Sequence, residues 1–111
     1  MRESLIESKV VEYARSRGWA AYKWASPGTK GVHDHIFFKG GLCFTIEFKA
    51  PGKKATKLQR MCAETLQSAG IYCACVDAIH VGKHIVDVLT RFVDGRDQPF
   101  MLPFDIESFK P

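Results

Sequence analysis

A carboxylate and an ammonium group alternate within one short apolar segment, Ile46 to Lys49. The sequence predicts a strand here, and side chains alternate between the two faces of a sheet, so Glu47 and Lys49 project to the same face. An acid beside a lysine can bind a hard divalent cation and orient a water molecule next to it. The same pattern is also common as a plain charge pair on solvent-facing strands, so alone it does not define a site.

Asp34 gives this pattern a second carboxylate. It begins the preceding predicted strand, and Gly40 and Gly41 are typical of a tight hairpin turn between the two strands. Counting back equally from this turn places Asp34 level with Glu47. Two carboxylates at neighbouring strand positions repel unless a cation joins them, and Mg²⁺ takes oxygen ligands at about 2.0–2.1 Å. The alternative is that Asp34 only caps the loop before the strand.

Polar side chains on two predicted helices could complete such a site. Glu7 and Glu3 are one turn apart on one face of the first helix, where either could reach the edge of the sheet; solvated charges near the helix N-terminus are the alternative. Gln59 follows Thr56 at the spacing of a capping box, which is a full structural explanation for it. Its amide could instead hold a phosphate or a water near Lys49.

The elements that would position these residues follow from hydrophobic periodicity and turn residues. Helices are predicted over residues 3–17, about 56–69 and 78–91, and strands over 19–24, 34–38, 42–49 and 71–76. The predicted inward-facing residues are Leu5, Ile6, Val10, Tyr13 and Ala14 on the first helix and Leu58, Cys62, Thr65, Leu66 and Ala69 on the second. The order α-β-β-β-α-β-α predicts an α/β domain with a mixed sheet flanked by helices.

Composition limits the class of protein. The chain has 111 residues, 46% hydrophobic and 25% charged, as expected for one globular domain. No apolar run approaches the roughly 20 residues that cross a bilayer, and the first residues lack the apolar region of a secretion signal. The four cysteines form no C-x-x-C pair, so we expect reduced thiols and a cytoplasmic protein.

The net charge of +4 is compatible with a polyanionic partner. Basic residues gather in sequence around the candidate site, and such a cluster could neutralise phosphates or simply be a solvated face: Lys23, Lys30, Lys39, Lys53, Lys54, Lys57 and Arg60. The histidines are weaker candidates. His33 and His35 flank Asp34 and would point away from it in a strand, and His80 and His84 have metal-binding spacing on a helix but no evident third ligand.

These pieces in this order resemble the VRR-NUC family of the PD-(D/E)XK nuclease superfamily. The matching segments are residues 23–34, 46–53 and 56–59, within a similarity that covers about residues 3–90. The resemblance implies a restriction-endonuclease-like core and Mg²⁺- or Mn²⁺-dependent cleavage of DNA phosphodiesters. By motif position the metal ligands would be Asp34, Glu47, the backbone carbonyl of Phe48 and Glu7, with Glu3 as the alternative to Glu7. Lys49 would polarise the attacking water, and Gln59 matches a glutamine of the family.

One position departs from the family pattern: His33 stands where the family usually has proline before the aspartate. Proline offers no ligand, so we expect activity to survive. His35 also stands where arginine is frequent, which could weaken a phosphate contact.

The resemblance also implies a nuclease domain over residues 1–93, with a tail at 94–111 that packs on the domain or on a partner. It implies a bacterial or phage homodimer that acts on branched DNA such as four-way (Holliday) junctions, with no nucleotide cofactor and no membrane. The alternatives are a nuclease of the same fold directed to flaps, nicks or ends, and a catalytically inactive DNA-binding module.

Overall fold

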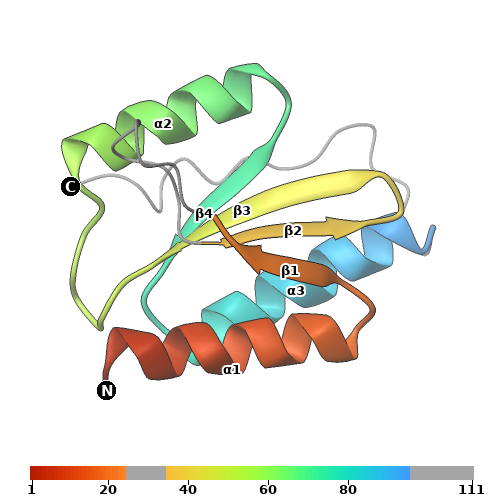
Figure 1. Cartoon of the computed structure of the whole chain (residues 1–111), viewed down its shortest axis with the longest axis horizontal. Coiled ribbons are helices and arrows are strands. Elements are labelled where there is room, and N and C mark those ends of the chain that lie inside the picture. The colour runs from red at the N-terminus through yellow and green to blue at the C-terminus, as the bar shows by residue number, and fades with distance from the viewer. Residues whose placement is uncertain (25–34, 96–111) are drawn as a thin grey trace.

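The computed structural model describes residues 1–24 and 35–95. Its elements follow one another as α1 (Glu3–Ser16), β1 (Ala20–Lys23), β2 (His35–Lys39), β3 (Leu42–Phe48), α2 (Lys57–Ser68), β4 (Tyr72–Val76) and α3 (Ile79–Val93) (Figure 1). The predicted order is confirmed, and each predicted element ends within two residues of its observed bounds. The result is a mixed α/β architecture that is compatible with a restriction-endonuclease-like core.

The four strands form one sheet in the order β1-β2-β3-β4. Strand β2 is antiparallel to both of its neighbours, β1 and β3, and β4 runs parallel to β3. The predicted hairpin turn is present at Gly40 and Gly41, whose φ angles are +56° and +82°. A two-residue turn with positive φ at both positions matches the twist of the strands and favours glycine. The turn sets a register that runs from Lys39 opposite Leu42 to His35 opposite Ile46.

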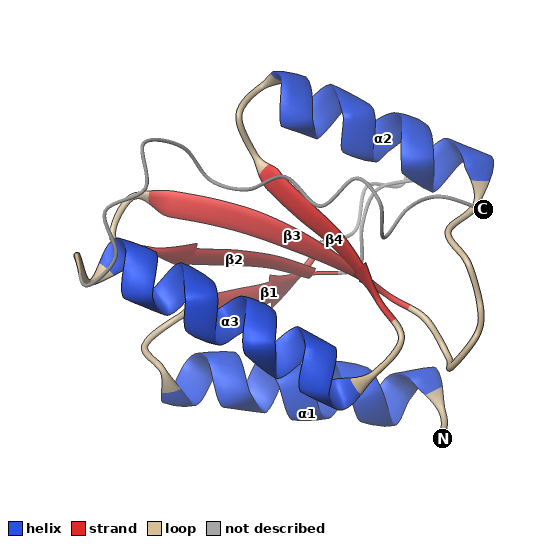
Figure 2. Ribbon diagram, turned by 180° about the vertical axis from the view of Figure 1, so that it is seen from behind, coloured by secondary structure: helices blue, strands red, loops and turns tan. Residues whose placement is uncertain are grey.

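Helices α1 and α3 cover one face of the sheet (Figure 2). The main core lies between them, and its aromatic centre is Phe44, which stacks on Phe37 at 4.5 Å between ring centroids and meets the edge of Trp19 at 4.8 Å. The two helices approach closely at Gly82 of α3, where a Cβ atom would lie 2.5 Å from Cγ2 of Val10. Glycine at this position therefore sets how closely α1 and α3 pack.

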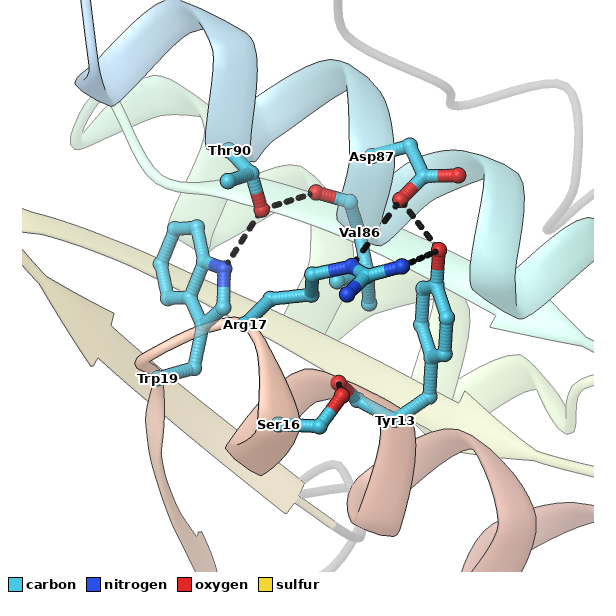
Figure 3. A network of polar contacts seen from close by, with 7 residues as sticks. All are labelled: Tyr13, Ser16, Arg17, Trp19, Val86, Asp87 and Thr90. Carbon is cyan, nitrogen blue, oxygen red and sulfur yellow. Dashed lines mark hydrogen bonds and ion pairs between the residues drawn. The ribbon is translucent and has the colours of Figure 1, made fainter.

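A polar network joins the ends of α1 and α3 over this core (Figure 3). The Tyr13 hydroxyl donates to Asp87 Oδ1 at 2.6 Å, and Arg17 Nη2 donates to the same hydroxyl at 3.1 Å. Beside them, Trp19 Nε1 donates to Thr90 Oγ1 at 2.9 Å. These bonds fix the orientation of α1, and hence of every residue on it, relative to the sheet.

Helix α2 lies on the opposite face of the sheet, where it packs against β4. Its buried contact is a small cluster of Ala55, Ala63 and Cys73, with Leu66, Ile71 and Cys75 packed against it. Because α2 lies along one strand at the edge of the sheet, it buries only a narrow stripe of mostly small side chains.

Part of the predicted apolar face was wrong. On α2 the residues predicted to face inward include three that are exposed, Leu58, Thr65 and Ala69, whereas the buried residue is Ala63. Leu5 on α1 is also 43% exposed. In both helices the periodicity correctly indicates an amphipathic helix. Which of the apolar residues are buried depends on where the helix touches the rest of the fold, and that contact covers only part of the apolar face.

The predicted tail begins where α3 ends, and only Asp94 and Gly95 of it belong to the described residues. The expected packing of residues 96–111 therefore lies outside them. Among the helices of the described part, none is long and apolar enough to cross a membrane.

Candidate catalytic site

Strand β3 carries Glu47 toward the face on which α2 lies. The alternate residues Phe44, Ile46 and Phe48 belong to the core under α1 and α3, so the intervening side chains point the other way. Glu47 is only 3% exposed and is opposite Cys75 of β4. Glu47 therefore faces α2, and a shared face with Lys49, which follows the strand, stays a prediction.

The Glu47 carboxylate acts electrostatically on the thiols around it. Burial, and then the charge of Glu47, raise the pKa of Cys75 to about 11. The same two causes raise the pKa of Cys62, which comes from α2. Glu47 is therefore an acid enclosed between β4 and α2, in surroundings where a negative charge is poorly solvated.

Lys49 follows directly on the end of β3. Its backbone N–H donates to the carbonyl of Val76 at 2.9 Å, so the extended conformation continues one residue past the strand. Its positive charge lowers the pKa of Cys75, the thiol that the Glu47 charge raises. The half-buried thiol of Cys75 is thus influenced by the charges of both Glu47 and Lys49.

Gln59 lies in the first turn of α2, and the predicted capping box is confirmed. The Thr56 side chain accepts from the Gln59 backbone N–H at 3.2 Å, and Gln59 Oε1 accepts from the Thr56 N–H at 2.8 Å. The amide thus has the structural role that its spacing predicts, and a further role at the site stays a prediction.

Asp34, the second predicted carboxylate, lies outside the described residues. The observed register is nevertheless the one from which its position was predicted, because the pairing runs back without a bulge from the turn to His35 opposite Ile46. In the sequence Asp34 precedes His35 and Glu47 follows Ile46, and the pairing of Asp34 with Glu47 stays a prediction.

Glu7 reaches the edge of the sheet, but on the face under α1. Its Oε1 lies 3.3 Å from Lys23 Nζ of β1 and 3.5 Å from His35 Nδ1 of β2. Because His35 and Glu47 point to opposite faces, Glu7 does not adjoin Glu47 across the sheet; it lies beside the first residue of β2. Glu3, the alternative acid, is exposed one turn away.

His35 is a site residue that sequence analysis missed. It is 6% exposed, packs beside Phe37 and Phe48, and contacts the candidate acid Glu7. Because neighbouring residues of a strand point to opposite faces, His35 was excluded as a ligand of the same ion as Asp34. The same rule places His35 on the face that α1 covers, where Glu7 lies.

A hollow of about 590 Å³ opens next to Glu7 and His35. Helix α1 contributes most of its lining, and the sheet adds Lys23 and His35. Its walls carry both basic and acidic groups.

The basic residues predicted to contact phosphate are not equally available. Lys23, Lys53, Lys54 and Lys57 are exposed, whereas Arg60 is half-buried and donates to the carbonyl of Ala55 at 2.8 Å. Lys39 pairs with Asp94 at 3.1 Å, and Lys30 lies outside the described residues.

The donor chemistry around Glu47 fits a hard divalent cation better than a soft one. Carboxylate and carbonyl oxygens suit Mg²⁺ or Mn²⁺, and the neighbouring Cys75, with a pKa of about 11, stays a neutral thiol at pH 7. No group of three or more His, Cys, Asp or Glu side chains is arranged around a common point within residues 1–24 and 35–95. His80 and His84, the weaker candidates, are exposed on α3.

No protein-family model matches this chain. A similar protein is found in Acyrthosiphon pisum secondary endosymbiont phage 1, where it is named "Putative nuclease p44"; the two are 42% identical over 60 residues. The aligned region is 53% of this chain and 64% of the phage protein, so the chain spans somewhat less than two thirds of the relative's length.

Proposed function

We propose that the chain is a divalent-metal-dependent endonuclease that hydrolyses DNA phosphodiesters, with branched DNA such as four-way junctions as its substrate. The observation that carries the proposal is the placement of Glu47, a nearly fully buried acid, with Lys49 at the end of β3 next to a hairpin of the predicted register. The similarity to a phage protein named as a nuclease supports the same class of activity.

Three groups would hold the cation directly in this proposal: Glu47 and the Phe48 carbonyl from β3, and Asp34, which precedes β2. Glu7 of α1 lies beside His35 rather than beside Glu47, so it would act only through the outer water shell of the cation. When bound, Mg²⁺ or Mn²⁺ supplies positive charge that polarises the phosphate and lowers the pKa of water.

Lys49 orients the attacking water and stabilises negative charge on the phosphate. The backbone of Lys49 is held at the end of β3 by its bond to Val76, and an ammonium positioned there before the reaction would stabilise the developing charge without reorganisation. The Gln59 amide, at the start of α2, would assist in positioning a phosphate oxygen. The exposed lysines at positions 23, 53, 54 and 57 and Arg60 would bind the flanking backbone, with Lys30.

Branched DNA and a homodimer belong together in this proposal. A two-fold dimer presents two active sites, which matches paired cuts across a four-way junction. Flap, nick or end cleavage and DNA binding without catalysis are the other outcomes that an experiment has to separate.

The test is a cleavage assay with labelled four-way, flap, duplex and single-stranded DNA, each with Mg²⁺, Mn²⁺ or EDTA. Wild type is compared with Lys49→Ala and with Lys9→Ala, a matched control on the exposed side of α1. We expect metal-dependent cutting that falls at least about 100-fold in Lys49→Ala and not in Lys9→Ala. Symmetric junction incisions by a dimer would support the resolving role.

Binding of DNA with no cutting of any substrate would overturn the enzyme and leave a binding module. Cutting confined to flaps, nicks or ends would overturn only the junction specificity. Equal activity of wild type and Lys49→Ala would contradict the proposed role of Lys49.

A further inference from the structure

Two aromatic side chains project from the face of the sheet that carries Glu47. Tyr22 on β1 is 62% exposed and Phe38 on β2 is 44% exposed. On the described part of the chain, helix α2 packs along β4 at the far side of this face and no helix covers β1 and β2. The sheet therefore presents an open aromatic surface, defined by Tyr22 and Phe38, beside the candidate catalytic strand.

The register fixes how these two side chains are arranged. Tyr22 is opposite Ile36, and Phe38 follows Ile36 by two positions on β2, so Tyr22 and Phe38 are diagonal neighbours on the same face. Diagonal neighbours in a sheet are about 7–8 Å apart, roughly twice the 3.4 Å rise between stacked bases. Two rings at this spacing can each receive one base.

The same register relates the aromatic surface to Glu47. Tyr22, Ile36 and Thr45 form one row across β1, β2 and β3. Glu47 lies two residues after Thr45 on the same face of β3, and β3 is two strands away from β1, which carries Tyr22. Strand spacing of about 4.8 Å and a rise of about 3.4 Å per residue place Tyr22 about 12 Å from Glu47. That is within a few nucleotides of a phosphate held at the candidate site.

Charge favours nucleic acid over a second protein on this surface. The exposed lysines at 53, 54 and 57 precede or begin α2, the helix that lies on this face. Lys23, next to Tyr22 in the sequence, points to the opposite face and pairs with Glu7. A stable dimer needs about 800 Å² from each partner, whereas two partly exposed aromatic residues supply a few hundred at most. Aromatic rings bordered by lysines are the usual means of binding unpaired bases.

We propose that Tyr22 and Phe38 stack unpaired bases of the DNA strand next to the scissile phosphate. The inference rests on the proposed action on DNA and deepens it: the substrate must present bases that are unpaired, or that become unpaired at the branch point on binding, within a few nucleotides of the cut. In a continuous duplex each base face is covered by the neighbouring base pair, so a blunt duplex has no accessible base face within its stack on which these rings could stack. Tyr22 and Phe38 are thus specificity-determining residues for the nuclease.

The test measures binding of a fluorescent 12-nucleotide single strand and of its blunt duplex by anisotropy, in EDTA and in the Lys49→Ala background, so that cleavage plays no part. Tyr22→Ala and Phe38→Ala are each expected to weaken single-strand binding by roughly 5- to 150-fold and duplex binding by less than about twofold. Tyr22→Phe should restore the affinity. Leu5→Ala is the control, because Leu5 is an apolar residue on α1 whose exposure is close to that of Phe38.

A 2-aminopurine placed in the single strand reports stacking directly. Wild type should quench its emission, and Tyr22→Ala should not, while both proteins keep the same melting temperature. Equal losses on single strand and duplex, or no loss on either, would overturn the inference. So would a wild-type dimer that Tyr22→Ala converts to a monomer, because the surface would then belong to a second copy.

Cleavage separates this inference from the function on which it rests. Metal-dependent cutting without stacking would support the proposed nuclease and contradict the role of Tyr22 and Phe38. Stacking without any cutting would support a DNA-binding surface at these residues and contradict the proposed nuclease.

Discussion

Glu47 on β3 and Cys75 on β4 lie opposite each other in the parallel strand pair, on the face of the sheet toward α2. The thiol reports the surroundings of the acid, because burial and the Glu47 charge together raise the pKa of Cys75 to about 11. Glu47 is only 3% exposed, and burial of this kind disfavours a negative charge unless a positive charge or hydrogen-bond donors compensate it. This pair is therefore where the electrostatics of the candidate site can be measured.

The raised thiol pKa predicts a loss of stability at alkaline pH. The ordinary value is 9.0 and the folded value about 11, so between these pH values the unfolded chain releases a proton that the folded chain keeps. The contribution is fully present below pH 9 and is lost as pH rises through about 11. Urea unfolding at pH 8 and pH 10.5 should show this decrease, and Cys75→Ala should have a smaller one. Identical pH slopes for the two proteins would contradict the prediction.

The packing of α1 on α3 predicts that Gly82→Ala destabilises the protein. The added Cβ would lie 2.5 Å from Cγ2 of Val10, so the helices must separate, at a cost of about 1–3 kcal/mol that exceeds the gain in helix propensity. Urea unfolding gives the free energy. The double variant Val10→Ala with Gly82→Ala should lose less than the sum of the two single variants. A Gly82→Ala protein as stable as wild type would show that the approach is looser than described.

Gln59→Glu separates the structural role of Gln59 from a catalytic one. Glutamate also completes a capping box, so the stability of α2 should stay close to that of wild type, whereas Thr56→Ala should lose about 1 kcal/mol. If the amide positions a phosphate oxygen, a second negative charge there should lower cleavage at least tenfold. Unchanged cleavage by a stable Gln59→Glu protein would leave Gln59 as a cap alone. Thermal unfolding and the cleavage assay together give the answer.

The sequence predicts the hairpin and its register well because the physics is local. Two glycines with positive φ close the turn, and alternation then assigns each side chain on β2 and β3 to a face. The capping box of α2 is local for the same reason, since Thr56 and Gln59 satisfy each other within one turn.

Predictions that depended on how layers meet were less successful. Leu58 falls on the apolar stripe of α2 yet is 47% exposed, because the helix packs over β4 through Ala63 and its neighbours. Likewise the contact of Glu7 with His35 depends on which face of the sheet α1 covers. No pattern within a single element contains that information.

The most direct test of the central claim is metal-dependent cleavage by Glu47→Gln, which keeps the shape of the side chain and removes its charge. The control is Glu64→Gln, an exposed acid on α2. With Mg²⁺ or Mn²⁺ titrated against a fixed amount of cleavable branched DNA, we predict activity in wild type and Glu64→Gln, at least a 100-fold loss in Glu47→Gln, and none in EDTA. Cleavage by Glu47→Gln at the wild-type rate, or cleavage that persists in EDTA, would contradict a metal site at Glu47.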